Sequence, residues 1–202
     1  MTEPATALTD FLLGSLALVF LSRLLDGRRV GAPLFFAGFA ISAVLGGTTH
    51  GFFSGDVSDA QRFLWWLTIA FTGVAASGLV TVGLGCFGWR DTRALLLSSS
   101  IFSAAVASYA WSDPRFLVSV VVTGAGSVMC LAGLASHGRK HAASGAGWAM
   151  LGLVLSIVAS LLQQERVAVH PVHFDHNATY HVFLIPALAL FYAGDRRIAA
   201  TP

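Results

Sequence analysis

The sequence has few charged residues. Lys, Arg, Asp and Glu together make up 11% of the 202 residues, whereas a soluble domain usually carries about 25%. So few charges cannot cover the surface of a globule of this size, which argues against an ordinary soluble enzyme and against a disordered protein. The net charge of +2 is also too small to indicate a nucleic acid or another polyanion as partner.

Cysteine is scarce as well. The two cysteines, Cys86 and Cys130, both lie in apolar runs, so the sequence predicts neither a disulfide framework nor a zinc site with cysteine ligands. Hydrophobic residues, in contrast, make up 55% of the chain. We therefore expect a polytopic membrane protein.

Apolar stretches that could cross a bilayer recur along the whole chain. A transmembrane helix needs about 20 mostly apolar residues, and the sequence predicts an all-α bundle of such helices in a single domain, residues 1–202. The connections between them are short and polar. The expected spans, seven in number, are Ala7–Leu25, Pro33–Phe53, Phe63–Gly88, Ala94–Trp111, Phe116–Ala135, Gly147–Leu162 and Asn177–Ala193.

The positions of the basic residues predict the orientation of this bundle. Of the 12 Lys and Arg residues, all but Arg62, Arg115 and Arg166 belong to the first, third and fifth connections, with their flanks, or to the C-terminal segment. Lys and Arg are enriched on the cytoplasmic side of membrane proteins. We therefore expect the N-terminus outside, the C-terminus in the cytoplasm, and the protein in a bacterial inner (plasma) membrane.

Two histidines lie on different predicted helices at the same depth. His50 is three residues before the end of the second span, and His181 is four residues after the start of the seventh. At a rise of 1.5 Å per residue, both are about 5–6 Å below the outer ends of their spans. Histidine is the commonest metal ligand, so the two imidazoles form a candidate ligand pair. Alternatively, His50 is satisfied by a backbone carbonyl where two helices approach closely.

Further polar residues surround the start of the seventh span. Asn177 and His181 are four residues apart and share one helical face. His176 reaches the same site if it lies in the bend that enters the helix. His170 and His173, on either side of Pro171, are more simply explained as loop residues.

Several acidic residues are expected at the same outer level. Asp175 is placed to cap the seventh helix, with Asn177 as a competing cap. Asp10 begins the first span, and Asp56 and Asp59 follow His50. These carboxylates could orient or supplement a histidine site.

Two short segments carry a resemblance to a known group of membrane proteins. Residues 46–52, Gly-Gly-Thr-Thr-His-Gly-Phe, and residues 176–181, His-Asn-Ala-Thr-Tyr-His, are similar to an uncharacterised bacterial seven-helix family. That family in turn resembles the CREST superfamily of membrane hydrolases, which contains alkaline ceramidases and adiponectin-type receptors.

The resemblance implies a zinc site built from the second and seventh spans. His50 matches the first zinc ligand and His181 the last, while Asn177 stands at the position of the middle histidine, with His176 beside it as a substitute. Gly46 stands where the hydrolases have a serine. The role of the assisting aspartate would fall to Asp56 or Asp59.

Three functions follow as hypotheses. The first is a zinc-dependent, ceramidase-like hydrolase that acts on a lipid amide or ester in the outer leaflet. Its metal site would be His50, His176, Asn177 and His181, with Asp56, Asp59 and Asp175 as catalytic acids. Three ligands would leave one position for a water whose pKa falls toward 7.

The second hypothesis is a non-catalytic subunit or receptor, whose outer His/Asp cluster binds a membrane protein partner or a small ligand. The third is a haem-binding helical protein, because histidines on facing helices can ligate iron. Under all three, the expected partners include membrane lipid and exclude nucleic acid.

Overall fold

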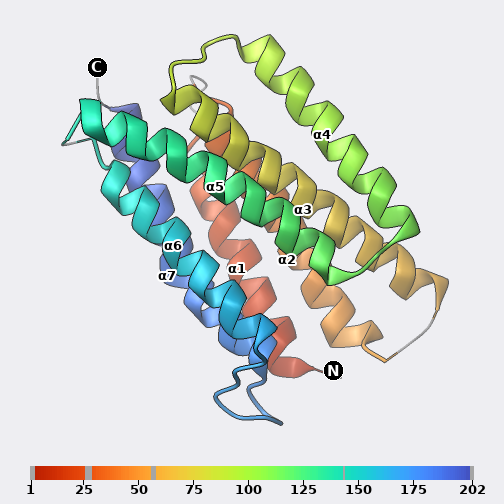
Figure 1. The fold of residues 1–202 in the computed structure, drawn as a ribbon. Coiled ribbons are helices and arrows are strands. Elements are labelled where there is room, and N and C mark those ends of the chain that lie inside the picture. The colour runs from red at the N-terminus through yellow and green to blue at the C-terminus, as the bar shows by residue number, and fades with distance from the viewer. Residues whose placement is uncertain (1–2, 26–28, 56–57, 143, 201–202) are drawn as a thin grey trace.

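The computed structural model describes residues 3–25, 29–55, 58–142 and 144–200. Each of the seven stretches expected to span a membrane forms a helix there (Figure 1). A short π-helix, η1 (Thr49–Phe53), continues the second one. The helices are α1 (Pro4–Ser22), α2 (Gly31–Thr48), α3 (Asp59–Cys86), α4 (Thr92–Ser112), α5 (Phe116–Lys140), α6 (Ala146–Gln164) and α7 (His176–Ala199).

Six of the helices form a ring. Neighbours around the ring are α1, α2, α3, α5, α6 and α7, and the ring closes where α7 packs against α1. The remaining helix, α4, packs on the outside against α3 (Figure 1). The two ends of the chain lie at opposite ends of the bundle, as expected for an odd number of alternating helices.

Six of the described helices, α1 to α6, are long and apolar enough to cross a membrane, with η1 counted in the second. This supports a multi-pass membrane protein. The seventh helix is long enough, because 24 residues extend about 36 Å. It is less apolar than α1 to α6, because its first two turns contain His176, Asn177 and His181 and its last turns contain Arg196 and Arg197.

Glycines let the central helices approach closely. A Cβ atom at Gly78 of α3 would lie 2.3 Å from the backbone nitrogen of Phe35 in α2. Similarly, Gly133 of α5 meets the backbone of Gly83 in α3, 2.3 Å from its carbonyl oxygen. Because lipid tails are as apolar as the side chains, helix association in a bilayer depends on such close contacts between small residues.

Aromatic side chains fill the half of the bundle farther from the N-terminus. Phe20 stacks on Tyr192 with ring centroids 4.3 Å apart, and Phe36 meets Phe20 edge-on at 5.6 Å. Phe191 of α7 contacts Phe35 of α2 at 5.1 Å. These rings tie α1, α2 and α7 together.

Candidate functional site

The ring of helices encloses a cavity of about 460 Å³, which we call the internal cavity. Its lining comes from α1, α2, η1, α3, α5, α6 and α7. At the end of the bundle that holds the N-terminus the lining is polar, and in the other half it is largely apolar. The polar lining residues at that end include Asp10, His50, Gln163, Gln164, His176, Asn177, Tyr180 and His181, and the apolar ones farther along include Phe35, Leu79, Leu153, Leu188 and Phe191.

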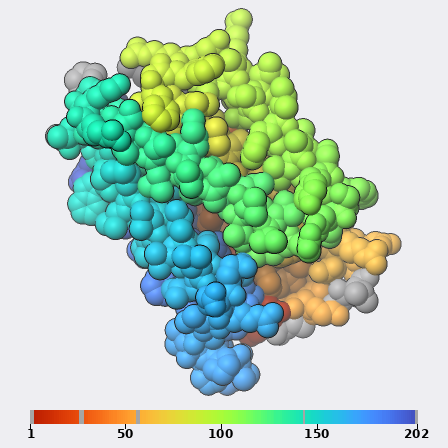
Figure 2. Space-filling model, in the orientation of Figure 1, coloured from red at the N-terminus to blue at the C-terminus, as the bar shows by residue number. Residues whose placement is uncertain are grey.

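The cavity also has an opening toward one side. α5 and α6 are close together where the short connection joins them, and they diverge toward their other ends (Figure 1). In Figure 2, the red and brown atoms of the first part of the chain are visible between the green α5 and the blue α6. The polar end of the internal cavity lies at this diverging end.

His50 is placed by the π-helix at the end of α2. Single turns of π-helix occur frequently at functional sites. The Nδ1 atom of His50 lies 2.6 Å from Oε2 of Glu3, and its backbone oxygen accepts a hydrogen bond from the Glu3 amide at 3.2 Å. Ser54 donates to the other oxygen of the same carboxylate. The residue before α1 therefore holds His50 from both backbone and side chain.

His181 is held by two side chains of α1. Its Nδ1 lies 2.9 Å from the Thr9 hydroxyl and its Nε2 lies 3.3 Å from Oδ1 of Asp10. Both His181 and Asp10 have side chains only 9% exposed. A buried ionisable pair of this kind is costly in a membrane protein unless it is internally satisfied, and such residues are by default candidates for function.

The hydroxyl of Thr9 connects His181 to the backbone of α1. It is within 2.9 and 3.0 Å of the backbone oxygens of Ala5 and Thr6. If it donates to either of them, it accepts from Nδ1–H of His181, and Nε2 of the ring faces Asp10. Nε2 of His181 and Oδ1 of Asp10 are 3.3 Å apart, so the two titratable groups of α7 and α1 are in direct contact.

Two glycines of α2 make room for Asp10. A Cβ at Gly47 would lie 2.9 Å from the Asp10 Cβ, and one at Gly46 would lie 3.3 Å from Oδ2 of the same residue. The Gly-Gly pair therefore lets α1 approach α2 closely enough to bring its carboxylate into the ring. The close approach of two helices near His50 that was considered in the sequence analysis is therefore present, but the partner of the His50 ring is the Glu3 carboxylate and not a backbone carbonyl.

Asp175 caps α7, as its position in the sequence indicates. Its Oδ1 accepts a hydrogen bond from the Ala178 amide at 2.9 Å and another from the Thr6 hydroxyl of α1 at 3.0 Å. Its backbone oxygen accepts from Thr179 at 2.8 Å. With these bonds Asp175 joins α7 to α1, and it is not part of the lining of the internal cavity.

The other predicted ligands at the start of α7 also line the cavity. His176 is the first residue of the helix, and Asn177 accepts a hydrogen bond from the Gln163 side chain of α6 at 3.1 Å. His50, His176, Asn177 and His181 therefore all line one cavity; depth along the spans predicts a shared site for His50 and His181 only.

The remaining predicted acids do not join them. Asp56 lies outside the described residues. Asp59 is fully exposed in the first turn of α3 and pairs with Arg62 at 3.8 Å. His170 and His173 are exposed in the connection between α6 and α7, where their rings stack on each other at 4.8 Å, which agrees with their interpretation as loop residues.

The arrangement does not provide a ready metal site. Across residues 3–25, 29–55, 58–142 and 144–200, no three His, Cys, Asp or Glu side chains are grouped so that they could hold a metal ion. Both ring nitrogens of His181 already face α1, and Nδ1 of His50 faces Glu3. The side chains as arranged therefore do not fit the zinc site that the resemblance implies.

Of the residues at the start of the chain that contact the histidines or α7, only Asp10 was named in the sequence analysis. Glu3, Thr6 and Asp10 are spaced at i, i+3 and i+7, which places them on one face at the start of an otherwise apolar helix. Thr9 lies beside them. This polar stripe was the available signal that the first helix faces the histidines.

Comparisons with known proteins give a family but no function. A family of unknown function (DUF6962) matches residues 5–200, so the chain belongs to that family. Neither curated proteins nor solved structures give a match.

Proposed function

We propose that this protein binds a single-chain lipid or a similar amphiphile inside its membrane-embedded ring of helices. The internal cavity carries the proposal: it has one polar and one apolar end, and its volume of about 460 Å³ lies within the usual range of about 300–1,000 Å³ for small-molecule sites. Such sites are mostly apolar and hold a few polar groups that fix orientation.

The dimensions of the cavity suit a lipid that enters from one leaflet. His181 and Phe191 both line it and are ten residues apart on α7, which corresponds to about 15 Å. This is about half of the 30 Å hydrocarbon core. The polar head would lie near His50 and Asn177, the chain would run toward Phe191, and the gap between α5 and α6 would admit the molecule from the side.

Seven membrane spans with the N-terminus outside complete the proposal. The length of α7 supports the seventh span, and its polar residues face the ring, where Thr9, Asp10 and Gln163 contact them. The bias of the basic residues toward the C-terminal side supports the orientation. The polar end of the cavity then belongs to the outer leaflet.

Photo-crosslinking tests the binding site. The purified full chain is illuminated with palmitic acid or palmitoylglycerol that carries a diazirine in its chain, and labelled peptides are identified by mass spectrometry. The variant Gly124→Phe fills the cavity, because Gly124 lines it and a Cβ there has nothing within 4 Å. Gly85→Phe is the matched control, since Gly85 has the same open space but is not part of the lining.

The expected result is label on α6 and α7 peptides of the wild type and the control, with a severalfold loss in Gly124→Phe. Equal labelling of all three proteins would show that the probes bind elsewhere, and would overturn the proposal.

The zinc-dependent hydrolase is a second candidate. Its support is that His50, His176, Asn177 and His181 line one cavity, which is where the resemblance places the ligands. A hydrolase that needs no metal is less favoured. Thr9 contacts His181, and His181 contacts Asp10, in the order of a nucleophile, a base and an acid. Thr9, however, does not line the internal cavity.

Metal content measured by mass spectrometry on purified protein decides this second candidate. Stoichiometric zinc in the wild type that is lost in His181→Ala would support a hydrolase. Absence of zinc, or zinc that His181→Ala retains, would rule out the predicted ligand set and leave lipid binding without metal.

A further inference from the structure

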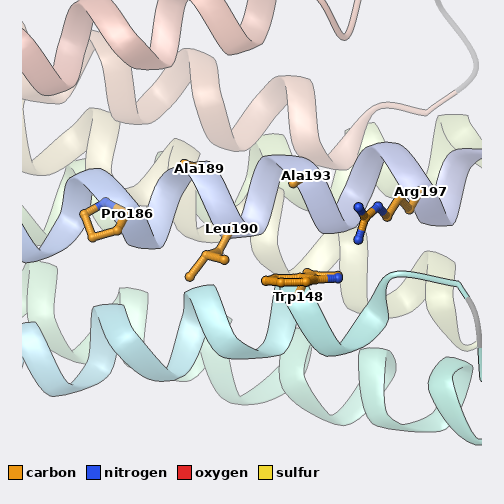
Figure 3. Close-up of a pocket in the computed structure, with 6 residues that line it drawn as sticks. All are labelled: Trp148, Pro186, Ala189, Leu190, Ala193 and Arg197. Atoms are coloured by element: carbon orange, nitrogen blue, oxygen red, sulfur yellow. The ribbon is translucent and has the colours of Figure 1, made fainter.

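A second hollow lies on the outside of the bundle, between α6 and α7 near the end where α7 finishes. Its volume is about 380 Å³, and we call it the α6–α7 groove. Figure 3 shows that Leu190 points from α7 toward α6 and that the Trp148 indole lies between the two helices beside Arg197. The groove is lined by Trp148, Pro186, Ala189, Leu190, Ala193 and Arg197.

One end of the groove is cationic. The Arg197 guanidinium lies 5.5 Å from the centre of the Trp148 ring, a favourable position for a cation over an aromatic face. The neighbouring charges point elsewhere: Arg196 donates to the backbone oxygen of Arg23, the residue after α1, at 2.8 Å, and Asp195 is buried against Arg29 at 3.3 Å. Arg197 is therefore the charged residue of the groove lining.

The rest of the groove is apolar, and its length matches one leaflet. Pro186 and Arg197 are eleven residues apart, about 16 Å along α7, while half of the hydrocarbon core is about 15 Å thick. Small side chains at Ala189 and Ala193 form the middle of the lining. Trp and Arg at one end are the residues expected at the boundary between lipid tails and headgroups.

We propose that the α6–α7 groove binds a phospholipid with an anionic headgroup from the leaflet at this end of the bundle. One acyl chain lies along Pro186, Leu190 and Ala193, and the headgroup phosphate pairs with Arg197. Basic pockets between transmembrane helices are a recurring form of site for acidic lipids. This site is separate from the internal cavity and does not depend on the function proposed for it.

Native mass spectrometry of the full chain tests the groove. The protein is exchanged into detergent with phosphatidylglycerol or phosphatidylcholine, and retained lipids are counted. Arg197→Gln is compared with Arg90→Gln, an exposed arginine in the connection between α3 and α4. One arginine near a lipid surface is worth about 1 kcal/mol, so we expect about fivefold weaker phosphatidylglycerol retention in Arg197→Gln and no change in Arg90→Gln.

Two further variants keep the test decisive if Arg197→Gln does not fold. Arg197→Lys keeps the charge and should retain phosphatidylglycerol, whereas Ala193→Trp fills the groove and should release both lipids. Retention that does not favour phosphatidylglycerol in the wild type, or that survives Ala193→Trp, would overturn the proposal. Displacement by inorganic phosphate alone would also overturn it, because the site would then recognise a free anion.

Discussion

The contact between α2 and α3 at Gly78 gives a quantitative prediction about stability. In Gly78→Ala the new Cβ would lie 2.3 Å from the backbone nitrogen of Phe35 and 2.6 Å from its Cα, whereas ordinary contact begins at 3.4 Å. The two helices must therefore separate by about 1 Å. Overpacking of this kind typically costs about 1–3 kcal/mol, and the upper part of that range applies because the contacted atoms are backbone.

Gly85→Ala is the matched control on the same helix. Nothing lies within 4 Å of a Cβ at Gly85, and alanine is favoured over glycine inside a helix by about 0.5–1 kcal/mol. The two variants should therefore differ by about 3 kcal/mol in free energy of unfolding. For a chain of this length, this corresponds to about 6–12 °C in Tm.

Thermal unfolding of both variants in the same detergent, followed by tryptophan fluorescence and by loss of the monodisperse peak in size-exclusion chromatography, measures the difference. Equal unfolding temperatures for Gly78→Ala and Gly85→Ala would refute the close approach of α2 and α3, and with it the ring that encloses the internal cavity.

Two other substitutions test the polar end of the bundle by the same unfolding assay. Asp10→Asn should cost less than about 1 kcal/mol, because the amide can form a hydrogen bond with Nε2 of His181, whereas Asp10→Ala should cost about 1–3 kcal/mol by leaving that nitrogen unsatisfied. Equal large losses would contradict this reasoning, because they would show that a hydrogen-bonding side chain is not sufficient at position 10. Asp175→Ala should cost about 1–2 kcal/mol because α7 loses its cap and its bond to Thr6. Asp59→Ala, at an exposed carboxylate, should be nearly neutral, and a loss as large as that of Asp175→Ala would contradict the assignment of Asp175 as the link between α1 and α7.

The helices were predictable because their signal is local. Apolar runs bounded by polar connections placed all seven, and capping chemistry placed Asp175 at the start of α7. The predicted first and seventh spans differ from their helices at the ends: α1 begins at Pro4 and α7 continues to Ala199, since polar residues in these turns are satisfied by helix ends or neighbouring side chains.

The candidate site was only partly predictable because it depends on how each helix is rotated. Counting residues along the spans gives depth, and depth grouped His50 with His181, which both line the internal cavity. Rotation about the helix axis is set by packing, for example by Gly47 against α1, and it determines that Glu3 and Asp10 meet the two histidines. The same lack of rotational information allowed Asp59 to be considered for a site that it does not reach.

The closure of the ring by α1 and α7 has a consequence for biosynthesis. Thr9 and His181 are 172 positions apart, which at about 5–20 residues per second means about 10–30 s of translation between them. Throughout that interval the first helix carries an acidic group whose partner has not yet been made. Until α7 has been made, Asp10 therefore depends on the insertion machinery or on water at the membrane surface for its polar contacts. A protein truncated before α7 should consequently be degraded by quality-control proteases.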